Sequence, residues 1–230
     1  MRQLPLPVRL RDFALFDTFE PGPNGAVVAW LADPAAAGPA AWLWGAPRCG
    51  KSHLLQAACA ARPGAAYLPA AELAAAGPDA LSGWEERCLV CIDDVDQLLG
   101  HRDWELALFR LFNALWERQG RLVVSAAVAP AAVAFELPDL ASRLAWGGVF
   151  HLLPLDDEQR VAALRRRAIH RGLELPEDVA RYLMKRLPRD MRALCDWLDR
   201  LDTASLAAGR RLTMPFVREV IASERQEHPA

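Results

Sequence analysis

Gly45-Ala-Pro-Arg-Cys-Gly50-Lys51-Ser52 matches the pattern G-x-x-x-x-G-K-[ST] at every fixed position. A short apolar run, Ala41–Trp44, precedes this stretch, and a helical pattern over Lys51–Ala61 follows it. Glycines let successive backbone N–H groups turn inward around a phosphate, and the start of a helix adds partial positive charge. The sequence therefore predicts a strand, a phosphate-binding turn and a helix in succession. The residues that we assign to nucleotide contacts are Gly45, Pro47, Arg48, Cys49, Gly50, Lys51, Ser52 and His53.

The last two residues of the motif and an acidic pair further along the chain have separate expected roles. Lys51 is expected to reach the β- and γ-phosphates, and the Ser52 hydroxyl to ligate Mg²⁺. Leu89-Val-Cys-Ile92-Asp93-Asp94 is an apolar strand that ends in two acids. We expect Asp93 to hold Mg²⁺ through water and Asp94 to polarise an attacking water. Asp94 is one methylene shorter than the glutamate more usual there, which argues against efficient hydrolysis by this chain.

Outside the motif, strand-like and helix-like segments alternate until Pro154 and only helical patterns follow. This alternation predicts an α/β fold, with a parallel sheet between layers of helices. We divide the chain into a flexible tail (1–12), a nucleotide-binding core (13–153) and a small all-helical lid domain (154–230). The expected further strands are Ala65–Leu68, Cys88–Ile92, Arg121–Ala126 and Val149–Leu153, and the expected helices are Asp103–Gln119, Asp156–Arg171, Pro176–Arg186, Asp190–Ala207 and Met214–Ser223.

Composition excludes several classes of protein. Apolar residues make up 53% and charged residues 24%, and the formal net charge is −2, so no general attraction to nucleic acid is expected. Apolar runs are too short to span a membrane, and the N-terminus lacks the apolar helix of a signal peptide. The five cysteines are scattered, which is typical of a reducing cytoplasm. Cys88 and Cys91 point to opposite faces of a strand, which argues against a zinc site.

The segment before the phosphate-binding turn carries a family resemblance. Phe16-Asp-Thr-Phe19-Glu-Pro-Gly22-Pro-Asn24 resembles the F-x-x-F-x-x-G-x-N segment that frames the adenine in DnaA-like AAA+ proteins. Within that family the chain is most similar to the Hda group, the regulatory inactivators of DnaA. The resemblance implies an AAA+ core with a helical lid, ADP or ATP and Mg²⁺ as ligands, and contacts of Phe16 and Phe19 with the base. It rests further on the segments Ser52–Cys59, Leu89–Asp93, Leu137–Leu144, Gly172–Val179 and Leu212–Val217.

The same resemblance implies roles for three residues. Arg143 aligns with the arginine finger that completes the nucleotide site of a neighbouring subunit; the alternative is an ordinary solvated arginine. Arg192 aligns with the sensor 2 arginine that reaches from the lid to the phosphates; the alternative is a surface charge on the lid. Ser125 ends an expected strand where the family places a polar sensor 1 residue.

The N-terminal run Gln3-Leu4-Pro5-Leu6-Pro7 resembles the short peptide that replication proteins insert into the β sliding clamp. Gln3, Leu4, Leu6 and Pro7 are the expected contacts, since leucines fill apolar pockets and prolines keep the peptide extended. The alternative is a tail whose apolar residues cover the domain.

Together these features predict a negative regulator of replication initiation. Bound to adenine nucleotide and to the clamp, it would stimulate hydrolysis of the ATP held by DnaA. Since only a lid-sized segment follows the core, direct sequence-specific DNA binding is not expected, whereas nucleotide-linked self-association is. Two alternatives stay open: a self-sufficient AAA+ ATPase or loader in replication, and a non-catalytic adaptor that binds DnaA.

Overall fold

The computed structural model describes residues 14–187 and 191–227, with side chains up to residue 224. The chain forms two compact units. Of the described residues, one unit contains 14–16 together with Pro23–Pro154, and the other combines Asp17–Gly22 with those from Leu155 onward.

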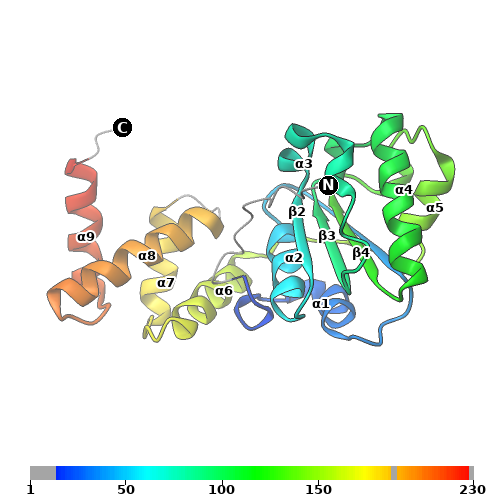
Figure 1. Cartoon of the computed structure of the whole chain (residues 1–230). Coiled ribbons are helices and arrows are strands. Elements are labelled where there is room, and N and C mark those ends of the chain that lie inside the picture. The colour runs from blue at the N-terminus through cyan, green and yellow to red at the C-terminus, as the bar shows by residue number, and fades with distance from the viewer. Residues whose placement is uncertain (1–13, 188–190, 228–230) are drawn as a thin grey trace. The chain divides into compact units, whose positions relative to one another are not determined.

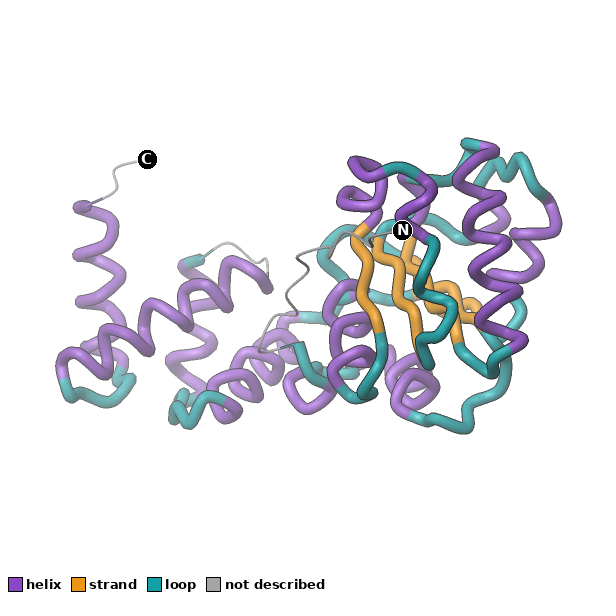
Figure 2. Tube along the Cα trace, in the orientation of Figure 1, coloured by secondary structure: helices purple, strands orange, loops and turns teal. Residues whose placement is uncertain are grey.

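The first unit is built on a five-stranded parallel sheet with the strand order β2-β3-β4-β1-β5. Helices lie on both sides of it, as Figure 1 and Figure 2 show. The strands are β1 (Ala40–Trp44), β2 (Ala66–Pro69), β3 (Leu89–Asp93), β4 (Arg121–Ala126) and β5 (Val149–His151). The helices are α1 (Gly25–Ala32), α2 (Lys51–Ala60), α3 (Ala70–Ala76), α4 (Arg102–Glu117) and α5 (Pro138–Leu144), with short 3-10 turns at Pro78–Leu81, Val95–Gln97 and Pro130–Ala132. Two further 3-10 turns, Phe16–Thr18 and Gly22–Asn24, each include residues of both units.

The two-residue period of the strands decides which side chains meet which helices. Buried side chains such as Ile92 of β3 and Val124 of β4, which pair across the sheet, join a core that α3, α4 and α5 cover. The opposite face of the sheet packs against α2, which in turn contacts α1. Asp93 and Ser125, each one residue further along its strand, therefore lie on the α2 side of the sheet. The phosphate-binding turn precedes this same helix.

Predicted and observed elements of this unit agree within two residues at their ends. The helix expected over Asp103–Gln119 spans Arg102–Glu117 instead. It ends because Gln119 adopts a positive φ of 59°, which an α-helix cannot accommodate. The seven-residue α5 is too short for its apolar periodicity to have predicted it.

The second unit is a bundle of the helices α6 (Asp157–His170), α7 (Glu177–Arg186), α8 (Met191–Ala208) and α9 (Met214–Glu227). Leu164, Leu183, Leu198 and Val217 are fully buried in its core. Asp156 begins α6 with a capping box, in which its side chain accepts from the backbone N–H of Gln159 at 2.8 Å. Four helices around one apolar core form the lid domain that the sequence predicted.

The segment Asp17–Gly22 precedes the sheet in sequence but packs with the helical unit. Thr18 and Phe19 are buried, and Glu20 forms an ion pair with Arg166 of α6 at 3.3 Å. Gly22 adopts a φ of +47°, and a Cβ there would lie 2.8 Å from the Leu155 side chain. Close packing therefore fixes a glycine at the end of this segment.

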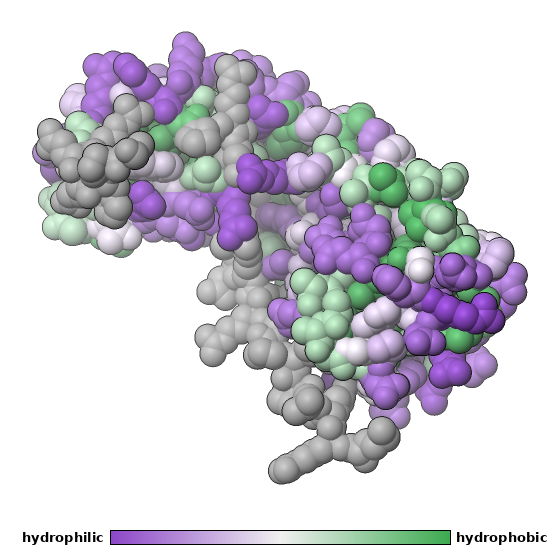
Figure 3. Space-filling model, turned by 90° about the horizontal axis from the view of Figure 1, so that it is seen from above, coloured by the Kyte–Doolittle hydropathy of each residue, from purple (hydrophilic) through white to green (hydrophobic). Residues whose placement is uncertain are grey.

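Seen from above, the surface of the sheet unit carries hydrophobic patches among hydrophilic side chains (Figure 3). Exposed large apolar residues of that unit are Trp116, Val128, Trp146, Val149 and Leu153. Within the described ranges, no helix is both long and apolar enough to cross a membrane.

Candidate nucleotide site and surface arginine

The phosphate-binding turn connects β1 to α2 through a backbone that has no room for larger residues. Gly45 adopts a φ of +154°, and a Cβ there would lie 2.5 Å from the Leu152 carbonyl oxygen and 3.1 Å from the Cys49 sulfur. Gly50, at the N-cap of α2, has a φ of 107°, a region that only glycine enters readily. Arg48 also has a positive φ, 67°, which costs strain in a non-glycine residue. The turn thus has the backbone conformation that a phosphate cradle requires.

Lys51 places its ammonium against the start of this turn. Its Nζ donates hydrogen bonds to the carbonyl oxygens of Gly45 at 2.8 Å and Ala46 at 3.3 Å, and the side chain is buried. Ser52 follows on the first turn of α2 and is exposed. A cation, a hydroxyl and a helix N-terminus are therefore combined within the turn, and this set of groups suits a phosphate.

Asp93 ends β3 with both carboxylate oxygens accepting hydrogen bonds from hydroxyl groups. The Ser125 hydroxyl donates to one oxygen, and the Tyr67 hydroxyl donates to the other at 2.6 Å. The Asp94 backbone N–H donates to the Ser125 oxygen at 2.8 Å, and Asp94 itself adopts a left-handed conformation with a φ of 56°. A buried, oriented carboxylate and the hydroxyl of Ser52 are the oxygen donors that Mg²⁺ prefers, so the residues present fit this ion.

Burial shifts the proton equilibria of three groups in this region. The pKa of Asp94 is raised by burial and then by the negative charge of Asp93, although Lys51 lowers it. The pKa of Tyr67 is raised by burial and by Asp93, so its hydroxyl stays protonated and acts as a donor. Burial also raises the pKa of the Cys49 thiol against the opposing effect of Lys51. Asp94 is consequently a weaker acid than an exposed aspartate.

The side chains of two residues in or near the predicted adenine segment, His53 and Asn24, form hydrogen bonds with backbone groups. His53 donates from Nε2 to the Leu15 carbonyl at 2.9 Å, which ties α2 to the residues before Phe16. Asn24 is buried and exchanges two hydrogen bonds with the backbone of Leu153, both at 2.9 Å. These contacts give His53 a supporting role toward the segment that carries Phe16.

Some predicted contacts involve residues from separate units or from outside the described ranges. Phe16 belongs to the sheet unit and is half-buried, whereas Phe19 belongs to the helical unit and is buried. Arg192 lies near the start of α8 and is exposed. Their joint contact with one nucleotide stays a prediction. The clamp-binding residues Gln3, Leu4, Leu6 and Pro7 lie outside the residues that the structure describes.

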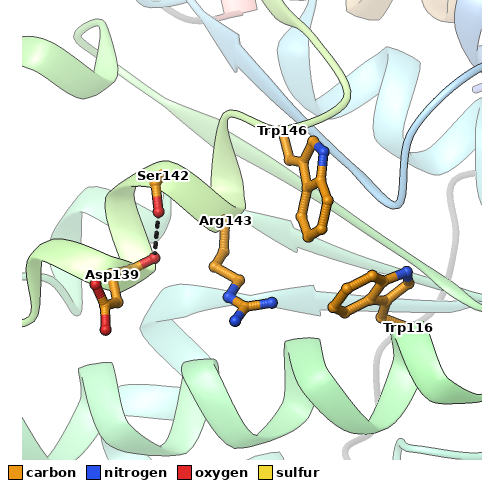
Figure 4. Close-up of a pocket in the computed structure, with 5 residues that line it drawn as sticks. All are labelled: Trp116, Asp139, Ser142, Arg143 and Trp146. Atoms are coloured by element: carbon orange, nitrogen blue, oxygen red, sulfur yellow. Dashed lines mark hydrogen bonds between the residues drawn. The ribbon is translucent and has the colours of Figure 1, made fainter.

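Arg143 lies on α5 in an aromatic environment formed by α4 and the segment after α5. Its guanidinium carbon is 5.4 to 5.7 Å from four ring centroids, those of Phe109, Phe112, Trp116 and Trp146. Figure 4 shows the side chain beside the two tryptophans, in a pocket also lined by Asp139 and Ser142. Within the described ranges, the Arg143 side chain makes no hydrogen bond and no ion pair. An arginine held in this way is not an ordinary solvated charge.

Glu105 fixes the loop from which α5 begins. This carboxylate is fully buried on α4 and accepts hydrogen bonds from three backbone N–H groups. The donors are Gly100 at 2.9 Å, Glu136 at 3.1 Å and Leu137 at 2.6 Å. Because Leu137 directly precedes α5, Glu105 positions the helix that carries Arg143.

Sequence reasoning missed Glu105 and Tyr67 for different reasons. Glu105 lies three residues before Leu108, in the apolar stripe of the predicted helix, so an acid at a buried position was a detectable signal. Tyr67 contacts Asp93 only because β2 and β3 are neighbours in the sheet. Local sequence does not determine the order of strands in a sheet, so no sequence pattern predicted the contact between Tyr67 and Asp93.

Comparisons with known proteins agree with this architecture. Residues 157–221 match the family model described as Hda, lid domain. Domain III of the Thermotoga maritima replication initiation protein DnaA is similar with a TM-score of 0.75 and 21% identity, over 94% of this chain and 98% of that chain. AMPPCP-bound DnaA from Aquifex aeolicus gives a TM-score of 0.67 and 20% identity, over 85% and 67% of the two chains. The Thermotoga maritima RuvB Holliday junction branch migration motor gives 0.60 and 16%, over 80% and 61%.

The two kinds of similarity differ in how much of the chain they cover. The solved structures share the fold, a parallel-sheet core with a phosphate-binding turn followed by a helical domain. The family model covers most of the helical unit, from Asp157 at the start of α6 to residue 221 within α9. The chain thus carries a helical domain that matches the Hda lid model, within a fold that it shares with domain III of DnaA.

Proposed function

We propose that this protein regulates replication initiation by stimulating hydrolysis of the ATP that DnaA holds. The lid match to Hda and the core fold shared with DnaA domain III both support a DnaA-related regulator. The observation that carries the proposal is the state of Arg143. Its guanidinium is held by aromatic rings in an open pocket, without an ion pair among the described residues, so its N–H donors stay available for phosphate oxygens.

In this proposal Arg143 acts on the nucleotide of a neighbouring DnaA subunit. A guanidinium supplied from a neighbouring chain stabilises negative charge on the transferring phosphoryl group, which is worth roughly 10³–10⁵ in rate in comparable systems. Arginine suits this role because its planar fork donates to two phosphate oxygens at once and stays charged at all relevant pH values. This chain would therefore complete a catalytic site that DnaA supplies.

The protein's own nucleotide site would hold ADP or ATP rather than turn it over rapidly. The turn around Gly45 and Gly50 would surround the phosphates and Lys51 would neutralise them, while Ser52 and Asp93 would hold Mg²⁺. The bound ion would balance phosphate charge. Asp94 is poorly suited to activating water, because its side chain is short, its backbone is left-handed and its pKa is raised, so we expect hydrolysis by this chain to be slow. We assign the nucleotide the task of ordering the core for contact with DnaA.

The β sliding clamp is the second proposed partner. The run from Gln3 to Pro7 supplies two leucines and two prolines in an extended pattern suited to a clamp pocket. Tethering to a clamp on DNA would raise the local concentration of the regulator near DnaA. After deletion of residues 1–12, adding loaded clamp should then no longer increase the rate at which this protein stimulates ATP hydrolysis by DnaA.

The decisive assay mixes this protein, ADP, DNA-loaded clamp and ATP-bound DnaA, and measures ATP hydrolysis. Arg143→Ala should lower the stimulated rate by roughly 10³-fold or to background, and Arg143→Lys should recover little because lysine lacks the planar fork. Arg87→Ala is the matched control. Arg87 is an exposed arginine that, like Arg143, lies over an aromatic ring, that of Trp84 at 5.6 Å, but at a separate site. Stimulation by Arg143→Ala at the parental rate would overturn the proposal.

The two alternative functions give different results in the same assay. A self-sufficient ATPase predicts substantial turnover by the isolated chain that Lys51→Ala abolishes. An adaptor predicts that tail deletion removes function while Arg143→Ala leaves it intact.

A further inference from the structure

Four rings surround the Arg143 guanidinium and form what we call the aromatic socket: Phe109, Phe112, Trp116 and Trp146. Trp116 and Trp146 meet edge to face, with ring centroids 4.6 Å apart and an interplanar angle of 67°. The Phe112 ring lies 6.3 Å from that of Trp116 and 6.4 Å from that of Trp146. Such contacts favour one arrangement of the rings, so the socket is an ordered feature rather than a loose patch.

The socket has a buried floor and exposed walls. Phe112 is 1% exposed, whereas Trp116 is 44% exposed and Trp146 is 52% exposed. Indole rings that served only to fill the core would be buried, and exposed tryptophans on a surface mark contact sites. Both exposed rings contact the Arg143 guanidinium, and this is the group whose position they restrict.

The way in which the socket holds Arg143 keeps its donors unused. A cation over an aromatic ring is attracted to the π-face without a hydrogen-bond acceptor, and the described residues offer the Arg143 side chain no other partner. Asp139 lines the same pocket, yet no ion pair joins it to Arg143. An ion pair would occupy the N–H groups that a phosphate needs, and the rings avoid this while still restricting the side chain.

We infer that Trp116 and Trp146 are positioning residues that restrict the Arg143 guanidinium through cation–π contact and leave its N–H groups for a neighbouring subunit's nucleotide. This inference rests on the proposed function. An exposed arginine otherwise samples many rotamers, and a side chain that is already placed loses less freedom when the transition state forms. The tryptophans thus increase the rate of ATP hydrolysis in the complex with DnaA. They do not increase the affinity of this protein for DnaA.

The first experiment uses the isolated protein and does not depend on DnaA. Ring currents of the socket should displace the Arg143 Nε–Hε resonance, which Arg143→Lys identifies by its loss. Trp116→Leu and Trp146→Leu should each move this resonance toward the position of an exposed arginine, and Trp116→Phe should retain part of the displacement. Trp84→Leu is the control, since Trp84 lies beneath Arg87 instead. An undisplaced parental resonance would overturn the inference.

The second experiment measures stimulated ATP hydrolysis by DnaA as a function of the concentration of this protein. Each Trp→Leu variant, checked for parental thermal unfolding, should lower the maximal rate by about tenfold or more while the half-maximal concentration changes by about twofold or less. Phenylalanine should restore most of the rate. In an Arg143→Ala background the same substitutions should have no further effect.

The outcomes separate the inference from the proposed function. A maximal rate at the parental level in both leucine variants overturns the inference, as does a raised half-maximal concentration with an unchanged maximum, which would make the tryptophans docking residues. Absence of stimulation by the parent refutes the proposed function itself. The inference is then also refuted, even if the Arg143 Nε–Hε resonance is displaced by the aromatic rings.

Discussion

The Ser125 hydroxyl donates a hydrogen bond to the Asp93 carboxylate. The Ser125 Oγ atom also accepts a hydrogen bond from the backbone N–H of Asp94 at 2.8 Å. Ser125 is fully buried at this point, where β4 lies beside β3. One serine thus fixes both the carboxylate proposed to hold Mg²⁺ and the backbone of the next acid. The sensor 1 role implied by family resemblance stays a prediction, and its structural basis would be the orientation of Asp93.

Ser125→Ala should weaken binding of magnesium–nucleotide more than binding of nucleotide without magnesium. It leaves the Asp94 N–H without its acceptor and Asp93 without one donor, which should lower the free energy of unfolding by about 1–3 kcal/mol. Calorimetry with and without Mg²⁺, together with denaturant unfolding, measures both effects. Ser223→Ala is the control, because that hydroxyl is exposed and bonds only to carbonyls of its own helix, Glu219 and Val220. Equal losses of affinity in both titrations would contradict the assigned role.

Glu105→Ala should be among the most destabilising single substitutions in the sheet unit. It removes the acceptor of three backbone N–H groups in a fully buried site, and we expect a loss of about 3 kcal/mol or more. Glu105→Gln should lose less, since an amide oxygen still accepts. Glu117→Ala, an exposed glutamate on the same helix, controls for the loss of charge. Denaturant unfolding decides the matter, and equal stability of the two alanine variants would refute the anchoring of α5 by Glu105.

Asp94→Asn should stabilise the fold at neutral pH but not in acid. Because burial and Asp93 raise the folded-state pKa of Asp94, the folded state holds more protons than the unfolded state between the two pKa values. Stability therefore falls as pH rises from the unfolded pKa of about 3.9 through the folded pKa, and the cost persists above it. Asparagine avoids the charge and tolerates the left-handed backbone.

Thermal unfolding at pH 7 and below about pH 3.9 tests this pH dependence. The gain from Asp94→Asn should be present at the higher pH and vanish at the lower one. Asp79→Asn, at an exposed position of the same unit, should give no comparable gain. A gain of the same size at both pH values would show that charge burial is not its cause.

Thiol labelling at neutral pH should begin at Cys88 and spare the phosphate-binding turn. Cys88 is exposed, whereas Cys49 is buried and its thiol pKa is raised by that burial, so little reactive thiolate forms there. Cys88→Ser should remove the fast phase and leave nucleotide affinity unchanged. Labelling of Cys49 should be at least about tenfold slower and should weaken nucleotide binding by steric block. Mass spectrometry of the labelled peptides tells the two apart, and equal rates would contradict the buried position of Cys49.

Local sequence predicted those parts of the molecule that depend on neighbouring residues along the chain. The phosphate-binding turn, the strand before it and α2 after it form one continuous stretch, so a single motif located all three. The lid helices were predicted because each has its own apolar stripe and helix-start signals. α5 escaped detection, since seven residues contain too few turns to show a period.

The arrangement of the site depends on contacts between distant segments, which local patterns do not encode. Tyr67 reaches Asp93 only through the pairing of β2 with β3. Likewise, the role of Arg143 was assigned by resemblance. The aromatic socket around it combines rings from α4 with Trp146, which follows α5. Which side chains would meet at these points depends on sheet order and helix packing, and both are properties of the whole fold.

The missing side chain of Gly45 lets the phosphate-binding turn lie against the backbone that follows β5. A methyl group at position 45 would collide with the Leu152 carbonyl oxygen, and the Leu152 N–H in turn donates to the Trp44 carbonyl oxygen at 2.7 Å. Both contacts use main-chain atoms that any residue at position 152 would supply. The demand for glycine therefore comes from a distant part of the sheet as well as from a phosphate, and a substitution at Gly45 would displace the strand end even in the absence of nucleotide.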